Sequence, residues 1–522
     1  MDTKALRQKI LDLAIRGKLV PQDSNDEPAS VLLERIRAEK QQMVKDGKLK
    51  AKDLKNDTII FVGDDNLHYE KFSDGTIKCL KDETKFFKIP KSWSFVRIRD
   101  IASVKGGKRI PKGKEFSAVP TPHAYIRVTN MKNRTITTSD LKYISDEIYE
   151  TIRNYTISKS DLYLTIAGTI GLVGEVPDLF DGMNLTENAV KVTPFSINKT
   201  FLCFCLLSCF VQNQFQDKTH QVAQPKLAIE RILNTIIPLP PLNEQILITN
   251  SVKTAFDLVD CVEKQNIALG EIITKTKSKI LDLAIRGKLI PQDPNDEPAS
   301  VLLERIHQEK EGLIKAGKLK RDKRESVIFR GDDNSYYEKF SDGSITLIKN
   351  KNIVDIPKSW TWVRFENIIE LISGQDLSKE SYNANGEGIP YITGASNIDC
   401  DKVIINRWTK TPKSIALAGD LLLTCKGTVG HIATLREEKV HIARQIMAIR
   451  TSYGVNQSYI QLFLRSYVTQ LKSSVNGIIP GIAREDVLRI PFPLPPLEEQ
   501  NRIVSTIQKI MNVLNYMENF LT

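Results

Sequence analysis

The sequence KILDLAIRGKLVPQDSNDEPASVLLERIRAEK (residues 9–40) returns as KILDLAIRGKLIPQDPNDEPASVLLERIHQEK (residues 279–310). The two copies differ only at the pairs Val20/Ile290, Ser24/Pro294, Arg37/His307 and Ala38/Gln308. A spacing of 270 residues is far too long for a solenoid repeat and equals a whole domain plus a linker. The chain is therefore predicted to be a tandem duplication of one structural module.

Further repeats extend the duplication, and their spacing shrinks along the chain. The repeated pairs are GDDNLHYEKFSDGT (63–76) with GDDNSYYEKFSDGS (331–344), IPKSWSFVRI (89–98) with IPKSWTWVRF (356–365), DLYLTIAGTIG (161–171) with DLLLTCKGTVG (420–430), and PLPPLNEQ (238–245) with PLPPLEEQ (493–500). The offset falls from 270 to 255, mostly between the IPKSW and PLPP segments, where the halves are barely alike. Repeated segments that flank dissimilar interiors predict one scaffold with two different recognition surfaces.

Composition places the chain among globular proteins with more than one domain. It has 522 residues, 41% hydrophobic and 26% charged, and its net charge of +11 is compatible with a polyanionic partner. Seven cysteines without CxxC spacing favour a reducing cytoplasm and no disulfide framework. The longest near-apolar run, residues 201–211, is about half of a membrane span, so we expect a cytoplasmic protein without a membrane segment.

A long coiled-coil helix is predicted after Pro240 and Pro241. Its 4-3 spacing of mostly apolar residues runs through Ile248, Val252, Ala255, Val259, Val262, Asn266, Leu269, Ile273, Thr276, Ile280 and Leu283. Gly287 supplies the stop signal. The predicted helix covers residues 243–286, or 44 residues and roughly 66 Å.

The two ends of the chain carry a divided second copy of this helix. Matching seam positions are Ile503, Ile507, Ile510, Leu514, Met517 and Leu521 near the C-terminus, and Leu6, Ile10 and Leu13 near the N-terminus. We therefore expect a circularly permuted repeat, in which the two long elements pack antiparallel about a pseudo-two-fold axis. This arrangement would place Met1 close to Thr522.

The segments that follow each repeated block predict a connector made of a helix and a hairpin. Pro28 begins the first connector helix and Gly47 ends it, and Asp74-Gly75 predicts the turn of the hairpin. Because the two connectors are nearly identical, they suit contacts with two copies of one partner protein.

Motifs for catalysis are missing from the sequence. There is no nucleotide-binding loop, no GxGxxG, no HExxH and no Asn/Asp-Pro-Pro-aromatic methyltransferase motif. Cys203, Cys205 and Cys209 have apolar neighbours, which favour a buried helix face over a metal site. The sequence thus predicts a binding scaffold with no catalytic, cofactor or metal site of its own.

The doubled PLPPLxEQ segments, the DLLLTxxGTVG segment and the unlike interiors resemble the specificity (S) subunit of a type I restriction–modification enzyme. The resemblance spans essentially the whole chain. It implies a mixed α+β (α/β) protein whose two target recognition domains are separated by a long antiparallel two-helix coiled coil. It further implies a non-catalytic subunit that binds a bipartite, asymmetric site in double-stranded DNA.

In that family the partners carry the chemistry. The resemblance implies two modification (M) subunits, which use S-adenosylmethionine to methylate adenine, and up to two restriction (R) subunits, which use ATP and Mg. The expected domains are an N-terminal helix completing the distal helix (1–20), a first connector (21–88), target recognition domain 1 (89–240), the central helix (241–287), a second connector (288–355), target recognition domain 2 (356–494) and the distal helix (495–522).

Basic residues between residues 97 and 134 surround glycines and a proline that predict an irregular loop. Arg and Lys pair with guanine edges or phosphates, and Asn pairs with adenine. The DNA-binding candidates of the first domain are Lys105, Lys108, Arg109, Lys112, Lys114, Arg127, Thr129, Asn130, Lys132, Asn133 and Arg134. A second candidate loop in this domain carries Gln221 and Gln224.

The equivalent candidates of the second domain are less basic. They are Gln375, Ser378, Lys379, Tyr382, Asn383, Thr393, Ser396, Asn397, Lys426, Arg444, Gln445 and Arg484, with Asp376 in the same loop as the first five. The two domains are therefore expected to read different sequences. Trp93 and Trp360 occupy matching apolar positions and are expected in the core.

Two other functions stay open at the level of sequence. The chain could be the specificity subunit of a fused type II system, in which methylase and nuclease share one partner chain. Alternatively, it could be a coiled-coil adaptor that binds proteins alone and makes no contact with DNA.

Overall fold

One long helix, α9 (Leu242–Ile285), connects the two repeats. Its 44 residues begin and end one residue earlier than the sequence predicted. All eleven predicted seam positions are buried or half-buried, which confirms the coiled-coil pattern. The expected proximity of Met1 and Thr522 stays a prediction, because both lie outside the described residues.

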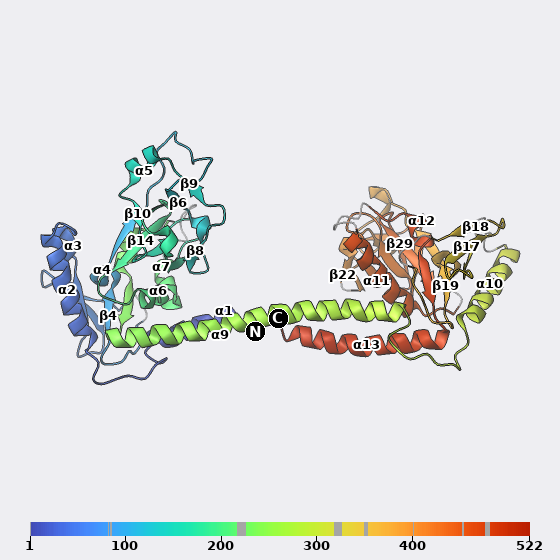
Figure 1. Cartoon of the computed structure of the whole chain (residues 1–522), viewed down its shortest axis with the longest axis horizontal. Coiled ribbons are helices and arrows are strands. Elements are labelled where there is room, and N and C mark those ends of the chain that lie inside the picture. Colours follow the sequence, from blue (N-terminus) through green and yellow to red (C-terminus); the bar gives the residue numbers. More distant parts are fainter. Residues whose placement is uncertain are drawn as a thin grey trace. The chain divides into compact units, whose positions relative to one another are not determined.

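The computed structural model describes residues 2–81, 83, 86–216, 226–317, 326–348, 353–399, 401–451, 454–474 and 481–521. The chain divides into two units, residues 1–265 and 266–522, and α9 begins in the first and ends in the second. Both units mix helices with antiparallel-rich sheets in nearly the same element order (Figure 1). The predicted mixed α+β architecture is confirmed.

In the first unit, the N-terminal helix α1 (Thr3–Ile15) lies along the first half of α9 (Figure 1). The Nη2 atom of Arg7 lies 2.9 Å from Oε2 of Glu263 near the middle of α9. Beyond the other end of α1, Gln22 donates a hydrogen bond to Glu244 in the first turn of α9. As residue numbers rise from Arg7 to Gln22, their partners on α9 fall from Glu263 to Glu244, so α1 and α9 are antiparallel.

In the second unit, α13 (Leu497–Asn519) makes the same kind of pair with the second half of α9 (Figure 1). Nζ of Lys277 lies 2.5 Å from Oε2 of Glu518. At the opposite end, Gln292 Nε2 donates to Glu499 Oε1 at 2.6 Å. The predicted antiparallel pairing is therefore present within each unit.

Each unit also contains a connector of one main helix and a three-stranded antiparallel sheet. The elements are α2 (Ala29–Lys45), α3 (Ala51–Lys55), β1 (Thr58–Val62), β2 (His68–Phe72) and β3 (Ile77–Cys79) in the first unit, and α10 (Ala299–Lys315), β16 (Ser326–Arg330), β17 (Tyr336–Phe340) and β18 (Ile345–Leu347) in the second. The hairpin predicted at Asp74-Gly75 joins β2 to β3. Strand β1, which pairs with β2, was not expected from the sequence.

The described part of the first interior contains three main sheets and the small two-stranded sheet of β7 (Met131–Lys132) and β8 (Thr135–Ile136). The strand orders of the main sheets are β4-β15, β12-β11-β14-β5 and β10-β13-β6-β9. The bounds are β4 (Ser94–Arg97), β5 (Ala102–Gly106), β6 (Ala124–Ile126), β9 (Lys142–Tyr143), β10 (Thr156–Ile157), β11 (Leu162–Thr165), β12 (Val173–Glu175), β13 (Met183–Leu185), β14 (Ala189–Pro194) and β15 (Ile236–Leu239). The short helix α4 (Ile98–Ile101) joins β4 to β5, and the helices α6 (Lys199–Leu207), α7 (Cys209–Gln216) and α8 (Ile229–Asn234) complete the domain.

The interior of the second unit repeats this topology. Its main sheets are β19-β30, β27-β26-β29-β20 and β25-β28-β21-β24, and β22 (Ile398–Asp399) pairs with β23 (Lys402–Val403) in a small fourth one among the described residues. The bounds are β19 (Thr361–Arg364), β20 (Ile369–Ser373), β21 (Ile389–Ile392), β24 (Trp408–Thr409), β25 (Ile415–Leu417), β26 (Leu421–Thr424), β27 (Ile432–Thr434), β28 (Lys439–Ile442), β29 (Ile446–Thr451) and β30 (Pro491–Leu494), with helices α11 (Gln457–Ser474) and α12 (Arg484–Leu488). The seven-residue helix α5 (Asp146–Ile152) lies between β9 and β10 only in the first unit, which accounts for much of the fall in offset.

A buried tryptophan joins each interior to the long helices. Trp93 Nε1 donates to Glu244 Oε2 at 2.8 Å, and Trp360 Nε1 donates to Glu499 Oε2 at 2.8 Å. Burial raises the pKa of both glutamates, although these hydrogen bonds oppose the rise. Trp93 and Trp360 are each 5% exposed, which confirms that they belong to the core.

Gly17 ends the turn after α1, with φ of +66°, and packs against the ring of Pro90. A Cβ atom added to Gly17 would lie 2.5 Å from Pro90 Cγ, and one added to Gly287 would lie 2.4 Å from Pro357 Cγ. Gly17→Ala and Gly287→Ala should each lower the free energy of unfolding by about 2 kcal/mol or more, since they combine strain with overpacking. Thermal and denaturant unfolding measure the loss.

Gly47→Ala is the matched control, because Gly47 has φ of +72° but nothing within 4 Å of an added Cβ atom. Its loss should be about 1 kcal/mol, from backbone strain alone. Equal losses at Gly17 and Gly47 would contradict the role assigned to the proline contact.

Candidate nucleic-acid interface

The predicted basic loop of the first unit leaves the end of β5 and passes directly over the turn between β13 and β14. An added Cβ atom on Gly107 would lie 2.2 Å from the carbonyl oxygen of Thr186, so this approach requires glycine. The backbone N–H of Lys108 then donates to the carbonyl of Leu185 at 2.9 Å. The start of the loop is thus held against the sheet. Its basic side chains are exposed, whereas Ile110 and Phe116 pack against the domain.

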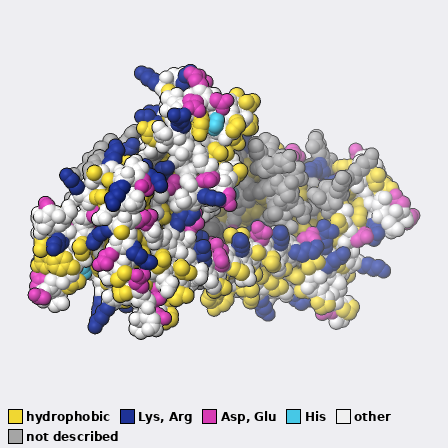
Figure 2. Space-filling view, turned by 60° about the vertical axis from the view of Figure 1, so that its left-hand side comes forward, with side chains coloured by type: hydrophobic (Ala, Val, Ile, Leu, Met, Phe, Trp, Pro, Cys, Tyr) yellow, Lys and Arg dark blue, Asp and Glu magenta, His cyan; other side chains and the backbone are white. Residues whose placement is uncertain are grey.

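Several basic side chains of this loop have acidic or aromatic neighbours. Arg109 Nε lies 2.6 Å from Glu187 Oε1, and Lys114 Nζ lies 2.7 Å from Glu147 Oε1. Lys108 Nζ lies 5.6 Å from the ring centroid of Tyr155. Lys105, predicted on the loop, lies instead within β5, where it pairs with Lys191 of β14. Lys105 and Lys112 are exposed and form no ion pair with a described residue. Figure 2 shows acidic side chains among the Lys and Arg side chains on the surface of the first unit.

The Arg109–Glu187 pair is held by further hydrogen bonds. Burial alone would raise the pKa of Glu187, but bonds from Arg109, from its own backbone and from Thr186 lower that pKa overall. The hydroxyl of Tyr125 donates to the carbonyl of Lys108 at 2.8 Å, and its oxygen lies 3.3 Å from Glu187 Oε2. Neither Glu187 nor Tyr125 was among the sequence candidates, and Glu187 is 78 residues from Arg109 in the sequence.

Asn130 and Asn397 correct the sequence-based assignment. Both are 0% exposed, and their side chains bind loop backbone. Asn130 Oδ1 accepts from the N–H of Arg127 at 3.1 Å, and Asn397 Nδ2 donates to the carbonyl of Ile404 at 2.8 Å. Neither amide can reach a base from this position, so both are structural residues.

Arg134 is the second correction. It lies at the tip of the short hairpin formed by β7 (Met131–Lys132) and β8 (Thr135–Ile136), and its guanidinium carbon is 4.7 Å from the ring centroid of Phe256 on α9. Asn133 and Arg134 line a cavity of about 410 Å³ whose other wall includes Lys253 and Phe256. We therefore assign Arg134 to the contact between the domain and the long helix rather than to the basic loop.

The remaining first-unit candidates differ in their surroundings. Thr129 and Lys132 are exposed, whereas Arg127 is half-buried and its Nη2 atom lies 2.7 Å from Asp140 Oδ2. Gln221 and Gln224 lie outside the described residues.

In the second unit, the matching loop follows β20. An added Cβ atom on Gly374 would lie 2.0 Å from the carbonyl oxygen of Ala443, and the N–H of Gln375 donates to the carbonyl of Ile442 at 2.9 Å. Next to it, Arg444 Nε lies 2.7 Å from Asp376 Oδ2. The fold thus brings together the Gln375 loop and the Arg444 turn, which the sequence offered as separate candidates.

The other second-unit candidates form two groups. Those with exposed side chains are Ser378, Lys379, Ser396, Lys426 and Gln445. Those that support the loops themselves are Tyr382, 5.5 Å from the ring of Tyr391, Asn383, which donates to the carbonyl of Glu387, Thr393, which donates to Asn397, and Arg484, which donates to the carbonyl of Leu371.

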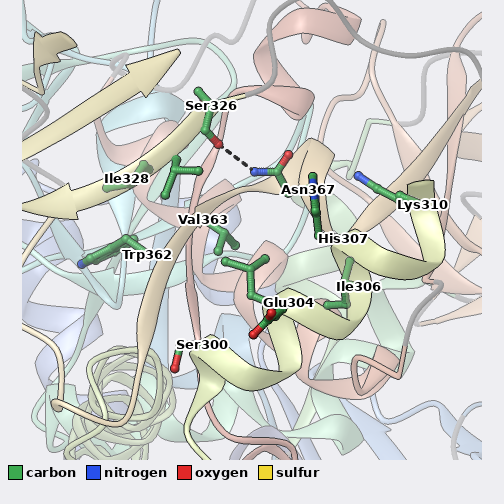
Figure 3. A pocket seen from close by; sticks show the side chains of 12 residues that line it. Ser300, Glu304, Ile306, His307, Lys310, Ser326, Ile328, Trp362, Val363 and Asn367 are labelled. Carbon is green, nitrogen blue, oxygen red and sulfur yellow. Dashed lines mark hydrogen bonds between the residues drawn. The ribbon is translucent and has the colours of Figure 1, made fainter. Parts of the chain in front are cut away.

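A separate cavity of about 300 Å³ lies in the second connector, between α10 and the strands β16 and β19 (Figure 3). Its lining is mostly apolar and includes Ile306, Trp362 and Val363, while Asn367 donates to the carbonyl of Ser326 across one wall. None of the candidate DNA-binding residues lines it.

Neither metal-ligand clusters nor membrane helices occur in the described part of the chain. Among those residues, no group of three or more His, Cys, Asp and Glu side chains is placed to hold a metal ion. None of the described helices combines the length and the apolar character that crossing a membrane requires. Cys203 and Cys205 are buried on α6, as predicted, and burial raises the pKa of Cys203 to about 12. The prediction is wrong for Cys209, which is exposed at the start of α7.

Comparison with known proteins identifies relatives of the whole chain. The family model of the type I restriction modification DNA specificity domain matches residues 90–270 and 357–519. The type I restriction enzyme EcoAI specificity subunit of Escherichia coli is 26% identical, over 99% of this chain and 90% of that protein. The EcoEI specificity subunit of Escherichia coli gives the same identity and the same coverage.

Solved structures share the fold. The crystal structure of the HsdS subunit from Thermoanaerobacter tengcongensis aligns with a TM-score of 0.51 at 19% identity, covering 84% of this chain and 94% of that chain. A chain from a structural study of assembly and conformational transition of the type I R-M system aligns with a TM-score of 0.53 at 18% identity and the same coverage.

The structural role of Asn130 can be tested by Asn130→Ala. The substitution leaves the N–H of Arg127 and two loop carbonyls without their buried partner, so the free energy of unfolding should fall by about 1–3 kcal/mol. Lys132→Ala, two residues away and exposed, is the control and should change it by less than about 0.5 kcal/mol. Similar thermal unfolding of the two variants would contradict this assignment.

Proposed function

Because the chain belongs to the type I restriction modification DNA specificity domain family and is a type I specificity subunit, we propose that it reads a bipartite, asymmetric site in double-stranded DNA. The observation that carries the proposal is the duplication itself. Both units repeat one topology on a shared helix, whereas the loops over their β13–β14 and β28–β29 turns carry different side chains. Residues 89–240 and 356–494 are the proposed target recognition domains.

In this proposal, exposed lysines and base-reading side chains have different tasks. Lys105, Lys112 and Lys132 are exposed without an ion pair to a described residue, so they suit phosphate oxygens, which position a protein on the duplex without reading sequence. The continuous α9 helix sets the length of the unread spacer between the half-sites. Half-sites read from the major groove are separated by turns of about 34 Å.

The connectors are the proposed docking surfaces for two copies of the M subunit. The same face of their three-stranded sheets exposes apolar side chains in both units, with Phe61 37% and Phe329 38% exposed, and Ile77 55% and Ile345 56% exposed. Duplicated apolar surfaces of this kind support binding of one partner twice. S-adenosylmethionine would be held by the M subunits, and ATP and Mg by up to two R subunits, with this chain non-catalytic.

Replacing one interior tests whether each domain reads its own half-site independently of the other. Exchanging residues 99–237 for the interior of another specificity subunit should change one half of the methylated sequence and leave the other half and the spacer unchanged. The readout is genome-wide mapping of methylated adenines in cells that carry the chain and its M partner. A change in both halves, or in neither, would argue against two independent readers.

The same cells, and the complex purified from them, distinguish this proposal from the two alternative functions. A protein-only adaptor would leave no footprint on DNA and no methylation change after the exchange. A fused type II partner would copurify as one chain carrying both methylase and nuclease, and its cleavage would not depend on ATP.

A further inference from the structure

The strand register identifies equivalent positions in the two interiors. Leu185 pairs with Ile126 in the parallel β13–β6 ladder, and Ile442 pairs with Ile392 in the parallel β28–β21 ladder. Leu185 and Ile442 also accept the same 2.9 Å hydrogen bond from the incoming loop. The residues two positions later, Glu187 and Arg444, are therefore equivalent.

The loop residues on the other side are equivalent for the same reason. Lys108 and Gln375 donate those two hydrogen bonds, so the next residues, Arg109 and Asp376, occupy matching positions. In the first unit the loop supplies the arginine and the turn supplies the carboxylate. In the second unit the loop supplies the carboxylate and the turn supplies Arg444. One ion pair is thus built twice with its charges reversed.

Both arginines contact their carboxylate through Nε. The contact is a 2.6 Å hydrogen bond for Arg109 and a 2.7 Å ion pair for Arg444, and the Nη atoms of both form no hydrogen bond to a described residue. The arginine side chains are 76% and 69% exposed, whereas those of Glu187 and Asp376 are 23% and 45% exposed. An exposed pair of this kind adds little to stability, so stability does not explain why both domains keep it.

The carboxylates are anchored on their second oxygen. Glu187 Oε2 accepts a hydrogen bond from the hydroxyl of Thr186 at 3.1 Å, and the hydroxyl oxygen of Tyr125 lies 3.3 Å from it. Asp376 Oδ1 accepts the backbone N–H of Arg444 at 3.1 Å. Each carboxylate therefore has a second contact that restrains it, and it orients a guanidinium through Nε while the Nη groups stay available to a ligand. Two parallel donors of this geometry match the O6 and N7 acceptors of guanine.

We propose that Arg109 and Arg444 are the specificity-determining residues of the two domains, each reading a guanine in its own half-site, with Glu187 and Asp376 as their positioning residues. The inference rests on the proposed DNA-binding function. Because the arginine comes from the loop in one domain and from the turn in the other, the guanine occupies a different place in each half-site. The reversal gives two domains of one fold different sequence preferences.

The test uses the full chain, expressed in cells with its M partner, and maps methylated adenines across the genome. Arg109→Ala should lower discrimination at one guanine–cytosine pair of one half-site by about tenfold to a hundredfold and leave the other half-site unchanged. Arg444→Ala should do the same in the other half-site only. Arg109→Lys keeps the charge but loses the paired donors, so it should relax the same position.

The positioning role has its own readout. Glu187→Gln should relax the position read by Arg109 less than Arg109→Ala does, and Glu187→Asp should restore part of the preference. The double variant Arg109→Asp with Glu187→Arg recreates the arrangement of the second unit. It should regain a guanine preference, at a shifted place, that Arg109→Asp alone abolishes.

Lys112→Ala is the control on the same loop and should weaken methylation equally at all sequences. Unaltered base preference in both Arg109→Ala and Arg109→Lys, with thermal unfolding like wild type, would overturn the inference while the wild-type chain still directs methylation to a bipartite motif. Absence of any bipartite motif with the wild-type chain would instead overturn the proposed function.

Discussion

Each unit depends on one buried hydrogen bond, between an indole N–H and a glutamate in the first turn of a long helix. In the first unit, Glu244 accepts from Trp93, where the chain enters the domain, and from Gln22, which follows the N-terminal helix. Three segments distant in sequence therefore meet at one carboxylate. Removing either partner would leave a buried polar group unsatisfied, which costs more than the bond itself contributes. The second unit builds the same junction from Trp360, Gln292 and Glu499.

Immediately beyond this junction, the domain is closed by its own first and last strands. Ser94 pairs with Leu239 in the β4–β15 ladder, and Thr361 pairs with Leu494 in β19–β30. The chain thus enters and leaves each interior at adjacent points, next to the long helices and the connector. Everything between these strands can differ between the two units without altering how the frame packs, which is why nearly identical connectors surround unlike interiors.

The elements set by local pattern could be predicted from the sequence, and those set by strand pairing could not. The 4-3 spacing gave α9 to within one residue, and Asp74-Gly75 gave the hairpin. Asn130 and Arg134 were predicted on the same DNA-binding surface because they are close in sequence. The fold buries the first and turns the second toward Phe256. Residue type alone does not show where a side chain points.

The ion pairs could not be predicted from the sequence for a similar reason. The pairing of β5 with β14 brings Arg109, which follows β5, beside Glu187, which precedes β14, across 78 residues of sequence. The pairing of β20 with β29 brings Asp376 beside Arg444 across 68 residues. A shared spacing motif could not reveal these pairs, because the two charges exchange places. The two interiors can differ by a whole element as well as by single side chains, since helix α5 is present in the first interior and has no counterpart between β24 and β25 in the second. For an engineer, the closed β4–β15 base is a natural graft junction, at which foreign loops could be installed while the supporting architecture is inherited intact.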